Sequence, residues 1–295
     1  MDPMQYGLKA VDFGRPCTAT TGLDRRGFLG ASLAGGFALA AGPAAASTII
    51  TDTEGLTAGE ITIRTDDGEI PAYRAMPETG KDLPLLLVIQ EIFGVHEHIR
   101  DVCRRYAKQG YYAVAPAMFH RQGDVSGMSD VNTILTEVVA KVPDAQVMAD
   151  LDATVAQAAA TGRVDAERLG VIGFCWGGRT VWLYAHHNPE VAAGVAYYGL
   201  VDGMQGEIKP HDPVDIAAEL KVPVLGLYAG ADEYIQRDAL RRMRTELLKS
   251  DSGSEIVVFP GVDHGFNADY RPTYDAAAAD YARRLARDWL TRHGV

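Results

Sequence analysis

A cysteine, an aspartate and a histidine in this sequence could together carry out nucleophilic acyl transfer. Cys175, Asp232 and His264 each stand shortly after an apolar run, and they occur in that order. In such a set the thiolate attacks a carbonyl carbon, the imidazole moves the proton, and the carboxylate holds the ring in the useful tautomer. Taken singly, they could be a core cysteine, a turn or cap aspartate and a solvated histidine. Their shared placement favours a catalytic triad.

The glycines on either side of Cys175 predict a sharp turn from a strand into a helix. Gly173 and Gly177 form a G-x-C-x-G pattern directly after the apolar run 169–172. A side chain pushed out at such a corner needs neighbours without side chains, so that strand and helix can pass closely. The N-terminus of the helix then points free N–H groups at the sulfur, which stabilises a thiolate.

A second segment predicts the groups that would stabilise the oxyanion of such a reaction. Gln-Glu-Ile-Phe-Gly at 90–94 follows the apolar run 85–89. We expect the backbone N–H groups of Ile92 and Trp176 to form the oxyanion hole. Glu91 is unexpected there, because a carboxylate near an oxyanion is electrostatically unfavourable unless it has a role. The alternative is a surface glutamate that points away.

Strand and helix patterns alternate from residue 60 onward, and these elements must position the reactive groups. Such alternation is typical of a mainly parallel sheet with helices on both faces, whose reactive groups lie at the carboxyl ends of the strands. The order nucleophile, acid, histidine indicates the α/β-hydrolase fold. We expect a single α/β domain over 60–295, with a hairpin at 61–75, strands at 85–89, 111–115, 169–172, 191–198, 222–228 and 255–259, and helices at 97–109, 143–160, 177–187, 237–250 and 274–292.

Five short motifs resemble those of the dienelactone hydrolase (carboxymethylenebutenolidase) family, and the resemblance covers residues 60–295. It implies a Cys175–His264–Asp232 triad that opens an enol lactone through a thioester intermediate, without metal or cofactor. It also implies that Glu91 accepts the thiol proton when substrate binds, so that the thiol stays protonated at rest. The motifs are Gln-Glu-Ile-Phe-Gly at 90–94, Gly-Phe-Cys-Trp-Gly-Gly at 173–178, Tyr-Tyr-Gly at 197–199, Ala-Gly-Ala-Asp at 229–232 and His-Gly-Phe at 264–266.

The residues that would recognise the substrate match the family less well. The resemblance implies two arginines that bind a substrate carboxylate; one corresponds to Arg121, but the other position, four residues after the catalytic histidine, holds Ala268. Arg271 is the candidate replacement, and Tyr198 is a candidate pocket hydroxyl. The alternatives are solvated loop positions for the arginines and core packing for Tyr198.

The favoured function is hydrolysis of an ester or lactone, in particular an enol lactone that carries a carboxylate. A general carboxylesterase or thioesterase for small substrates is the second interpretation, because Ala268 departs from the family pattern. A non-catalytic protein that binds a small molecule or a partner protein is the third, and the complete triad argues against it.

The composition disfavours several classes of partner. The 295 residues carry a net charge of −11, which argues against binding to nucleic acid or to anionic membrane surfaces. The pairs His96/His98 and His186/His187 lack a third ligand at a suitable spacing, so no metal site is predicted. A small-molecule substrate is the expected partner, and the protein is expected to be a monomer or a small homo-oligomer.

The first 46 residues resemble a twin-arginine (Tat) signal. Arg-Arg-Gly-Phe-Leu at 25–29 precedes a soft apolar stretch at 31–41, and Pro-Ala-Ala-Ala at 43–46 offers a cleavage site. We expect export to the periplasm or out of the cell, with residues 47–59 leading into the domain. If the signal is not cleaved it could still tether the protein, although the apolar stretch is too short and glycine-rich for a stable transmembrane helix.

Overall fold

The computed structural model describes residues 48–295, so the predicted Tat segment lies outside the described part. The strands are β1 (Leu56–Thr65), β2 (Gly68–Pro77), β3 (Leu83–Ile89), β4 (Tyr112–Pro116), β5 (Val164–Phe174), β6 (Val191–Tyr197), β7 (Val224–Ala229) and β8 (Glu255–Phe259). The helices are α2 (Glu97–Ala107), α3 (Val131–Thr133), η1 (Ile134–Val138), η2 (Val139–Lys141), α4 (Asp144–Ala159), α5 (Trp176–His187), α6 (Pro213–Ile216), η3 (Ala217–Glu219), α7 (Arg237–Leu247) and α8 (Ala276–Arg292). None of the helices in residues 48–295 is long and apolar enough to cross a membrane.

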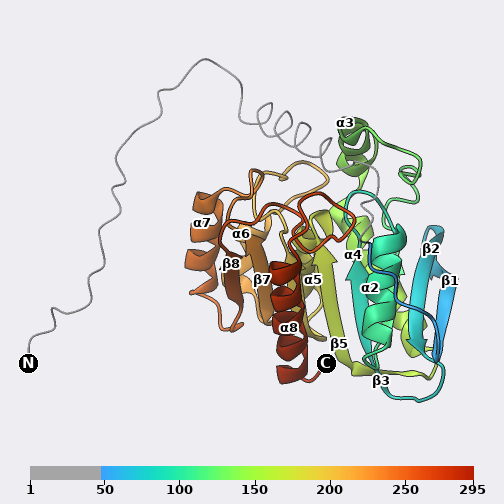
Figure 1. Cartoon of the computed structure of the whole chain (residues 1–295). Helices are drawn as coiled ribbons and strands as arrows, with labels where there is room; N and C mark the ends of the chain where they lie inside the picture. Colours follow the sequence, from blue (N-terminus) through green and yellow to red (C-terminus); the bar gives the residue numbers. More distant parts are fainter. Residues whose placement is uncertain (1–47) are drawn as a thin grey trace, which may run out of the picture.

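All the strands join one mainly parallel sheet, in the order β1-β2-β4-β3-β5-β6-β7-β8 (Figure 1). The hairpin β1–β2 closes through a turn between Thr65 and Gly68, and β2 adds antiparallel to β4. From β4 to β8 every pair is parallel. Because parallel strands point the same way, the carboxyl ends of β3, β5, β7 and β8 lie at one edge of the sheet. The predicted α/β-hydrolase architecture is confirmed.

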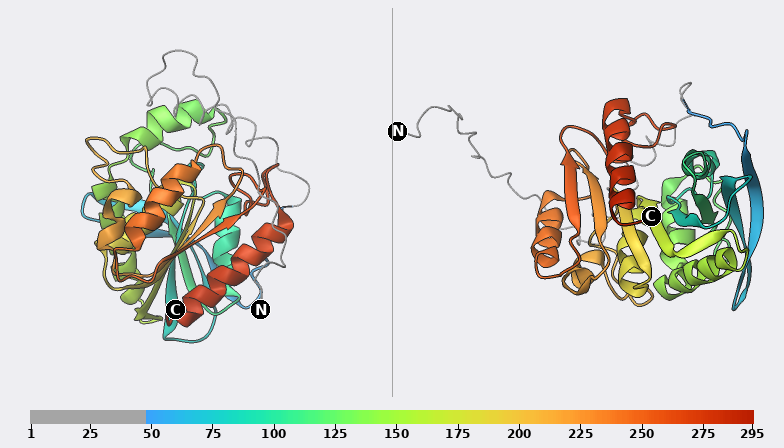
Figure 2. Two further views of the ribbon diagram at one scale, coloured as in Figure 1. Left: turned by 90° about the vertical axis from the view of Figure 1, so that its left-hand side faces the viewer. Right: turned by 90° about the horizontal axis from the view of Figure 1, so that it is seen from below.

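Helices cover both faces of this sheet. Figure 2 shows α2 and α8 on one face, and α4, α5 and α7 on the other. Strands β4 and β7 are therefore buried along their whole length, as is nearly all of β3, and they read as continuous apolar runs rather than alternating ones. On α2, the predicted apolar face at Ile99, Val102, Cys103 and Tyr106 is buried against the sheet.

Three details differ from the expected elements. Strand β1 begins at Leu56, earlier than the expected start of the domain at residue 60. Strand β5 extends over Val164–Phe174, and its register with β6 shifts between Leu169 and Gly170. Residues 131–141, where no element was expected, form short helical turns. The Asp130 side chain accepts the Thr133 N–H there, which starts a helix, and buried apolar residues at 131, 134 and 138 hold it on the core.

Candidate active site

Cys175 lies at the apex of the predicted strand-to-helix turn, between β5 and α5. Its backbone has φ 55° and ψ −114°, a conformation that costs a non-glycine residue about 1–3 kcal/mol. A Cβ on Gly173 would lie 2.3 Å from the carbonyl oxygen of Gly177, and a Cβ on Gly177 would lie 2.5 Å from the carbonyl oxygens of Ile89 and Gln90. The turn is possible only because these glycines let β5, α5 and the end of β3 approach one another.

Asp232 and His264 follow β7 and β8, and their side chains are bonded to each other. The Nδ1 atom of His264 lies 2.8 Å from Oδ2 of Asp232. The other carboxylate oxygen, Oδ1, accepts the backbone N–H groups of Tyr234 at 2.9 Å and Ile235 at 3.2 Å. Asp232 is thus both the turn residue of its loop and the partner of the imidazole, and the turn fixes the direction of its carboxylate.

The imidazole of His264 is buried and held between two tyrosine rings. Its ring centroid lies 5.0 Å from that of Tyr198 and 5.1 Å from that of Tyr234. Burial disfavours the charged imidazolium, but Asp232 and Cys175, through their charges and hydrogen bonds, outweigh it and raise the pKa of His264 to about 10. At neutral pH the imidazole therefore carries the proton beside the sulfur. The charge of the buried Asp232 is the largest of the effects that raise this pKa. The expectation that the thiol stays protonated at rest stays a prediction.

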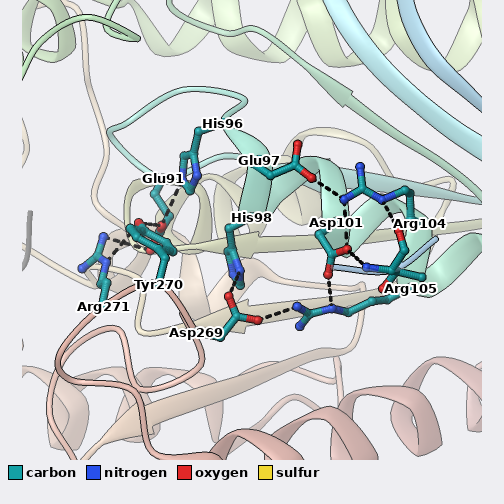
Figure 3. A network of polar contacts seen from close by, with 11 residues as sticks. Glu91, His96, Glu97, His98, Asp101, Arg104, Arg105, Asp269, Tyr270 and Arg271 are labelled. Carbon is teal, nitrogen blue, oxygen red and sulfur yellow. Dashed lines mark hydrogen bonds and ion pairs between the residues drawn. The ribbon is translucent and has the colours of Figure 1, made fainter. Parts of the chain in front are cut away.

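Glu91 is completely buried and is bound by a cluster of polar side chains (Figure 3). Its Oε1 lies 3.0 Å from Nη2 of Arg271, and its Oε2 accepts a hydrogen bond from the Tyr270 hydroxyl. The Nε2 atom of His96 lies 3.5 Å from the same oxygen. Burial alone would raise the pKa of Glu91, but Arg271 and then His96 outweigh it and hold that pKa well below its usual range. The buried glutamate is therefore ionised, and the alternative of a surface glutamate is wrong.

A chain of ion pairs ties the segment 264–271 to helix α2 (Figure 3). Nδ1 of His98 lies 2.9 Å from Oδ1 of Asp269, whose Oδ2 lies 2.5 Å from Nη2 of Arg105. Arg105 also lies 2.5 Å from Asp101, one helical turn back. Because Asp269 directly precedes Tyr270, this chain fixes Tyr270 and Arg271, two of the three residues that hold Glu91.

The two residues predicted to form the oxyanion hole occupy the expected elements. Trp176 is the first residue of α5, where a backbone N–H has no partner within the helix. Ile92 lies in a turn after β3 that the Gly94 N–H closes on the Glu91 carbonyl at 3.4 Å. Both side chains are buried, and the role of their N–H groups stays a prediction.

Arg121 lies against the β1–β2 turn and helix α4. Its guanidinium contacts the Asp150 carboxylate at 2.8 and 3.0 Å, the Thr65 hydroxyl at 2.6 Å, and Asp67. The alternative of a solvated loop arginine is therefore wrong, but two carboxylates already neutralise the charge predicted to bind substrate. Arg271 is likewise buried and paired with Glu91.

Tyr198 has a strained backbone and a buried hydroxyl. Its φ is 36°, and its hydroxyl makes no hydrogen bond to the rest of residues 48–295. Burial raises the pKa of Tyr198 well above its usual value, and the nearby charges of Glu91, Arg271 and Cys175 also act on it. The side chain is completely buried in the core, as the core-packing alternative expects, and a role for its hydroxyl in binding substrate stays a prediction.

Sequence reasoning missed Tyr234, Tyr270 and the roles of His96 and His98. In the sequence, His96 and His98 suggest only a possible metal site. Residues 48–295 hold no group of three or more His, Cys, Asp or Glu side chains placed to bind a metal ion. Tyr270 had one signal, its position next to the candidate Arg271. Tyr234 had none, because its contact with His264 joins two separate loops.

Comparison with known proteins gives consistent matches. The family model described as "Dienelactone hydrolase family" matches residues 70–294. The "Putative carboxymethylenebutenolidase" of Methylorubrum extorquens is 54% identical over 282 residues, covering 95% of this chain and 97% of that protein. A protein of the same name from Escherichia coli K12 is 46% identical over 260 residues, covering 88% of this chain and 96% of its own. A crystal structure described as "Putative Dienelactone Hydrolase", from Klebsiella pneumoniae, superposes with a TM-score of 0.78 at 48% identity, covering 80% of this chain and 99% of that one.

Proposed function

The chain belongs to the dienelactone hydrolase family, and we propose that it hydrolyses an ester or lactone through a thioester on Cys175. The family and the relatives together identify a hydrolase of the carboxymethylenebutenolidase type. The observation that carries the finer proposal is the position of His264, bonded to Asp232 at 2.8 Å and charged beside Cys175. That arrangement supplies a nucleophile together with a proton donor for the leaving group.

The chemistry needs only these side chains and water. The Cys175 sulfur attacks the carbonyl carbon, and the N–H groups of Ile92 and Trp176 bind the resulting oxyanion. His264 donates its proton to the leaving oxygen as the C–O bond breaks and the thioester forms. The neutral imidazole then takes a proton from water, whose hydroxide attacks the thioester. The C–S bond breaks and frees the thiolate, and the carboxylic acid product leaves and gives its proton to water. The thiolate and imidazolium are thereby restored, so the proposed cycle uses no metal or cofactor.

Glu91 has a different part in this proposal. It can accept a proton only after Arg271 has withdrawn, because that ion pair keeps its pKa low. We therefore assign Glu91 to holding Arg271 and Tyr270 beside the sulfur at rest.

Release of p-nitrophenol from p-nitrophenyl acetate tests the thioester. The wild type should release a burst of about one equivalent per chain, and mass spectrometry should find one acetyl group on the Cys175 peptide. Cys175→Ala should lose the burst and at least about 10³-fold in rate. Cys103→Ala is the matched control, because it removes the other buried thiol of the part of the chain that the structure describes. An acetylated intermediate that survives Cys175→Ala would refute the proposal.

Neutral esters and lactones are the second candidate class of substrate, and one observation favours them. Both arginines predicted to bind a substrate carboxylate are paired, Arg121 with Asp150 and Asp67, and Arg271 with Glu91. A substrate carboxylate would have to break one of these pairs. kcat/KM for dienelactone and for neutral lactones, in wild type and Arg121→Gln, separates the two classes. A preference for dienelactone that Arg121→Gln abolishes would establish the carboxylate class; no preference would establish the neutral class.

We also propose export through the Tat pathway, on the sequence of residues 25–46. The full chain with Arg25→Lys and Arg26→Lys should stay inside the cell, while the wild type should reach the periplasm or the medium. Equal distribution of the two forms between cell fractions would exclude this route.

A further inference from the structure

A crevice of about 260 Å³ lies between helices α2 and α8. The two helices run along the same face of the sheet (Figure 1), and the crevice opens over β5 and β6. Its floor is apolar and aromatic, formed by Ile172, Phe174 and Tyr197. The residues of the proposed triad do not line it. The crevice is therefore a separate cavity on the face that carries the ion-pair chain.

The rim of the crevice is strongly cationic in an acidic protein. Of residues 48–295, four arginines line it, and Asp280 is the one acidic residue among them. Asp280 binds Arg284 at 2.6 Å but lies 4.0 Å from Arg283. The positive charge of Arg283 is thus only weakly neutralised by the nearby carboxylate of Asp280.

Two buried polar atoms in the lining make no hydrogen bond within residues 48–295. They are Oδ1 of Asn267 and Nη1 of Arg283. Asn267 is only 2% exposed, and it lines the crevice together with Arg283. Buried polar atoms normally have hydrogen-bond partners, so an amide oxygen and a guanidinium nitrogen that both lack one at the same cavity call for an explanation.

We propose that this crevice binds a small carboxylate with a flat apolar body. The guanidinium of Arg283 can bind a carboxylate through its planar fork of N–H groups. The Asn267 amide can turn to donate a second hydrogen bond to it. The apolar body would lie on the rings of Phe174 and Tyr197. A cavity of about 150 Å³ already accepts benzene, so the crevice has room for an aromatic ring with a short acidic arm.

The site is connected to the catalytic residues through one segment of chain. Asn267 stands between His264 and the Glu91 partner Arg271, and Arg105, at the crevice, also holds Asp269. A ligand on Asn267 would therefore act on the segment that carries the imidazole. Hydrolysis of an ester or lactone produces a carboxylate, so binding of a carboxylate product at this site would inhibit the enzyme. This last step rests on the proposed function, whereas the binding itself does not.

Calorimetric titration with phenylacetate tests the binding. The protein is first alkylated at Cys175 with iodoacetamide, which blocks the catalytic pocket. Phenylacetate should still bind, while neutral phenylacetamide and inorganic phosphate should bind at least about tenfold more weakly. Arg283→Gln should weaken phenylacetate binding about ten- to a hundredfold. Arg292→Gln is the matched control, because it removes an arginine of the same helix that does not line the crevice.

Several results would overturn the proposal. They are no binding to the alkylated protein, equal affinity for phenylacetamide, and equal affinity in Arg283→Gln and Arg292→Gln. Arg287→Gln, at a more exposed crevice position, should also weaken binding and guards against a folding defect in Arg283→Gln. For the feedback step, phenylacetate should lower the kcat for p-nitrophenyl acetate in wild type but not in Arg283→Gln. Purely competitive inhibition would refute that step, whereas loss of the Cys175 burst would refute the proposed function alone.

Discussion

At the scale of single residues, the two carboxylate oxygens of Asp232 serve two different roles, as a turn residue and as the partner of His264. The sequence alone presents these roles as alternatives. Oδ1 accepts two backbone N–H groups of its own turn, and Oδ2 binds His264. An aspartate after a strand is commonly a turn residue, so the local pattern could not reveal the second role. The contact with His264 joins loops after different strands, and only the sheet brings them together.

The raised pKa of His264 makes stability depend on pH in a defined direction. The folded protein holds this proton up to a pKa of about 10, whereas the unfolded value is 6.5. The stabilisation is therefore complete below about pH 6.5 and is lost as the pH rises through 10. Urea unfolding at several pH values should show the free energy of unfolding falling more steeply over this window in wild type than in His264→Gln. His186→Gln, an exposed control, should behave like wild type; equal slopes in all three proteins would contradict the prediction.

Replacing Glu91 should separate its structural role from its catalytic one. Glu91→Gln leaves Arg271 buried without its carboxylate, which should cost about 3–5 kcal/mol of stability and lower the acylation rate at least about tenfold. The double variant Glu91→Gln with Arg271→Met removes the unpaired charge and should recover much of the stability. Urea unfolding and the stopped-flow burst rate measure the two effects. If acylation recovers together with stability, Glu91 has only a structural role.

At the scale of elements, the sequence predicts those features whose cause lies in the local sequence, and it does not predict those that depend on distant packing. The elbow, the hairpin and the parallel strands follow from glycine positions and apolar runs, and the structure confirms them. The register shift in β5 and the helical turns at 131–141 depend on packing against distant elements. The salt bridge of Asp269 to Arg105 on α2 spans 164 positions, which no local pattern encodes.

The elbow itself predicts a selective sensitivity. In Gly177→Ala, the new Cβ would lie 2.5 Å from the carbonyl oxygens of Ile89 and Gln90, so the end of β3 must move. We expect a loss of about 1–3 kcal/mol of stability and a larger loss of activity, because the residue after Gln90 is Glu91. Gly206→Ala, which meets no atom within 4 Å, is the control. Thermal unfolding and the burst rate should distinguish them, and a Gly177→Ala variant with wild-type activity would contradict this account of the turn.

At the scale of the whole molecule, the sheet gathers onto one edge groups that are far apart in the sequence. Cys175, Asp232, His264 and Glu91 follow four different strands, and the fold and family expected from the sequence are confirmed. The substrate-recognising residues were harder to predict, because the sequence does not show which carboxylate will form an ion pair with a given arginine. Arg121 forms ion pairs with Asp67 in the β1–β2 hairpin and with Asp150 in α4. These two elements become neighbours only on folding.

The segment 264–271 has a consequence for how such a protein can diverge. Within eight consecutive residues it carries the imidazole, the crevice amide, the anchor to α2 and two of the three partners of Glu91. Substitutions in this single short segment can therefore change the charges and hydrogen bonds around the Cys175 sulfur. Specificity in this lineage can then drift without any change to the strands that hold the nucleophile.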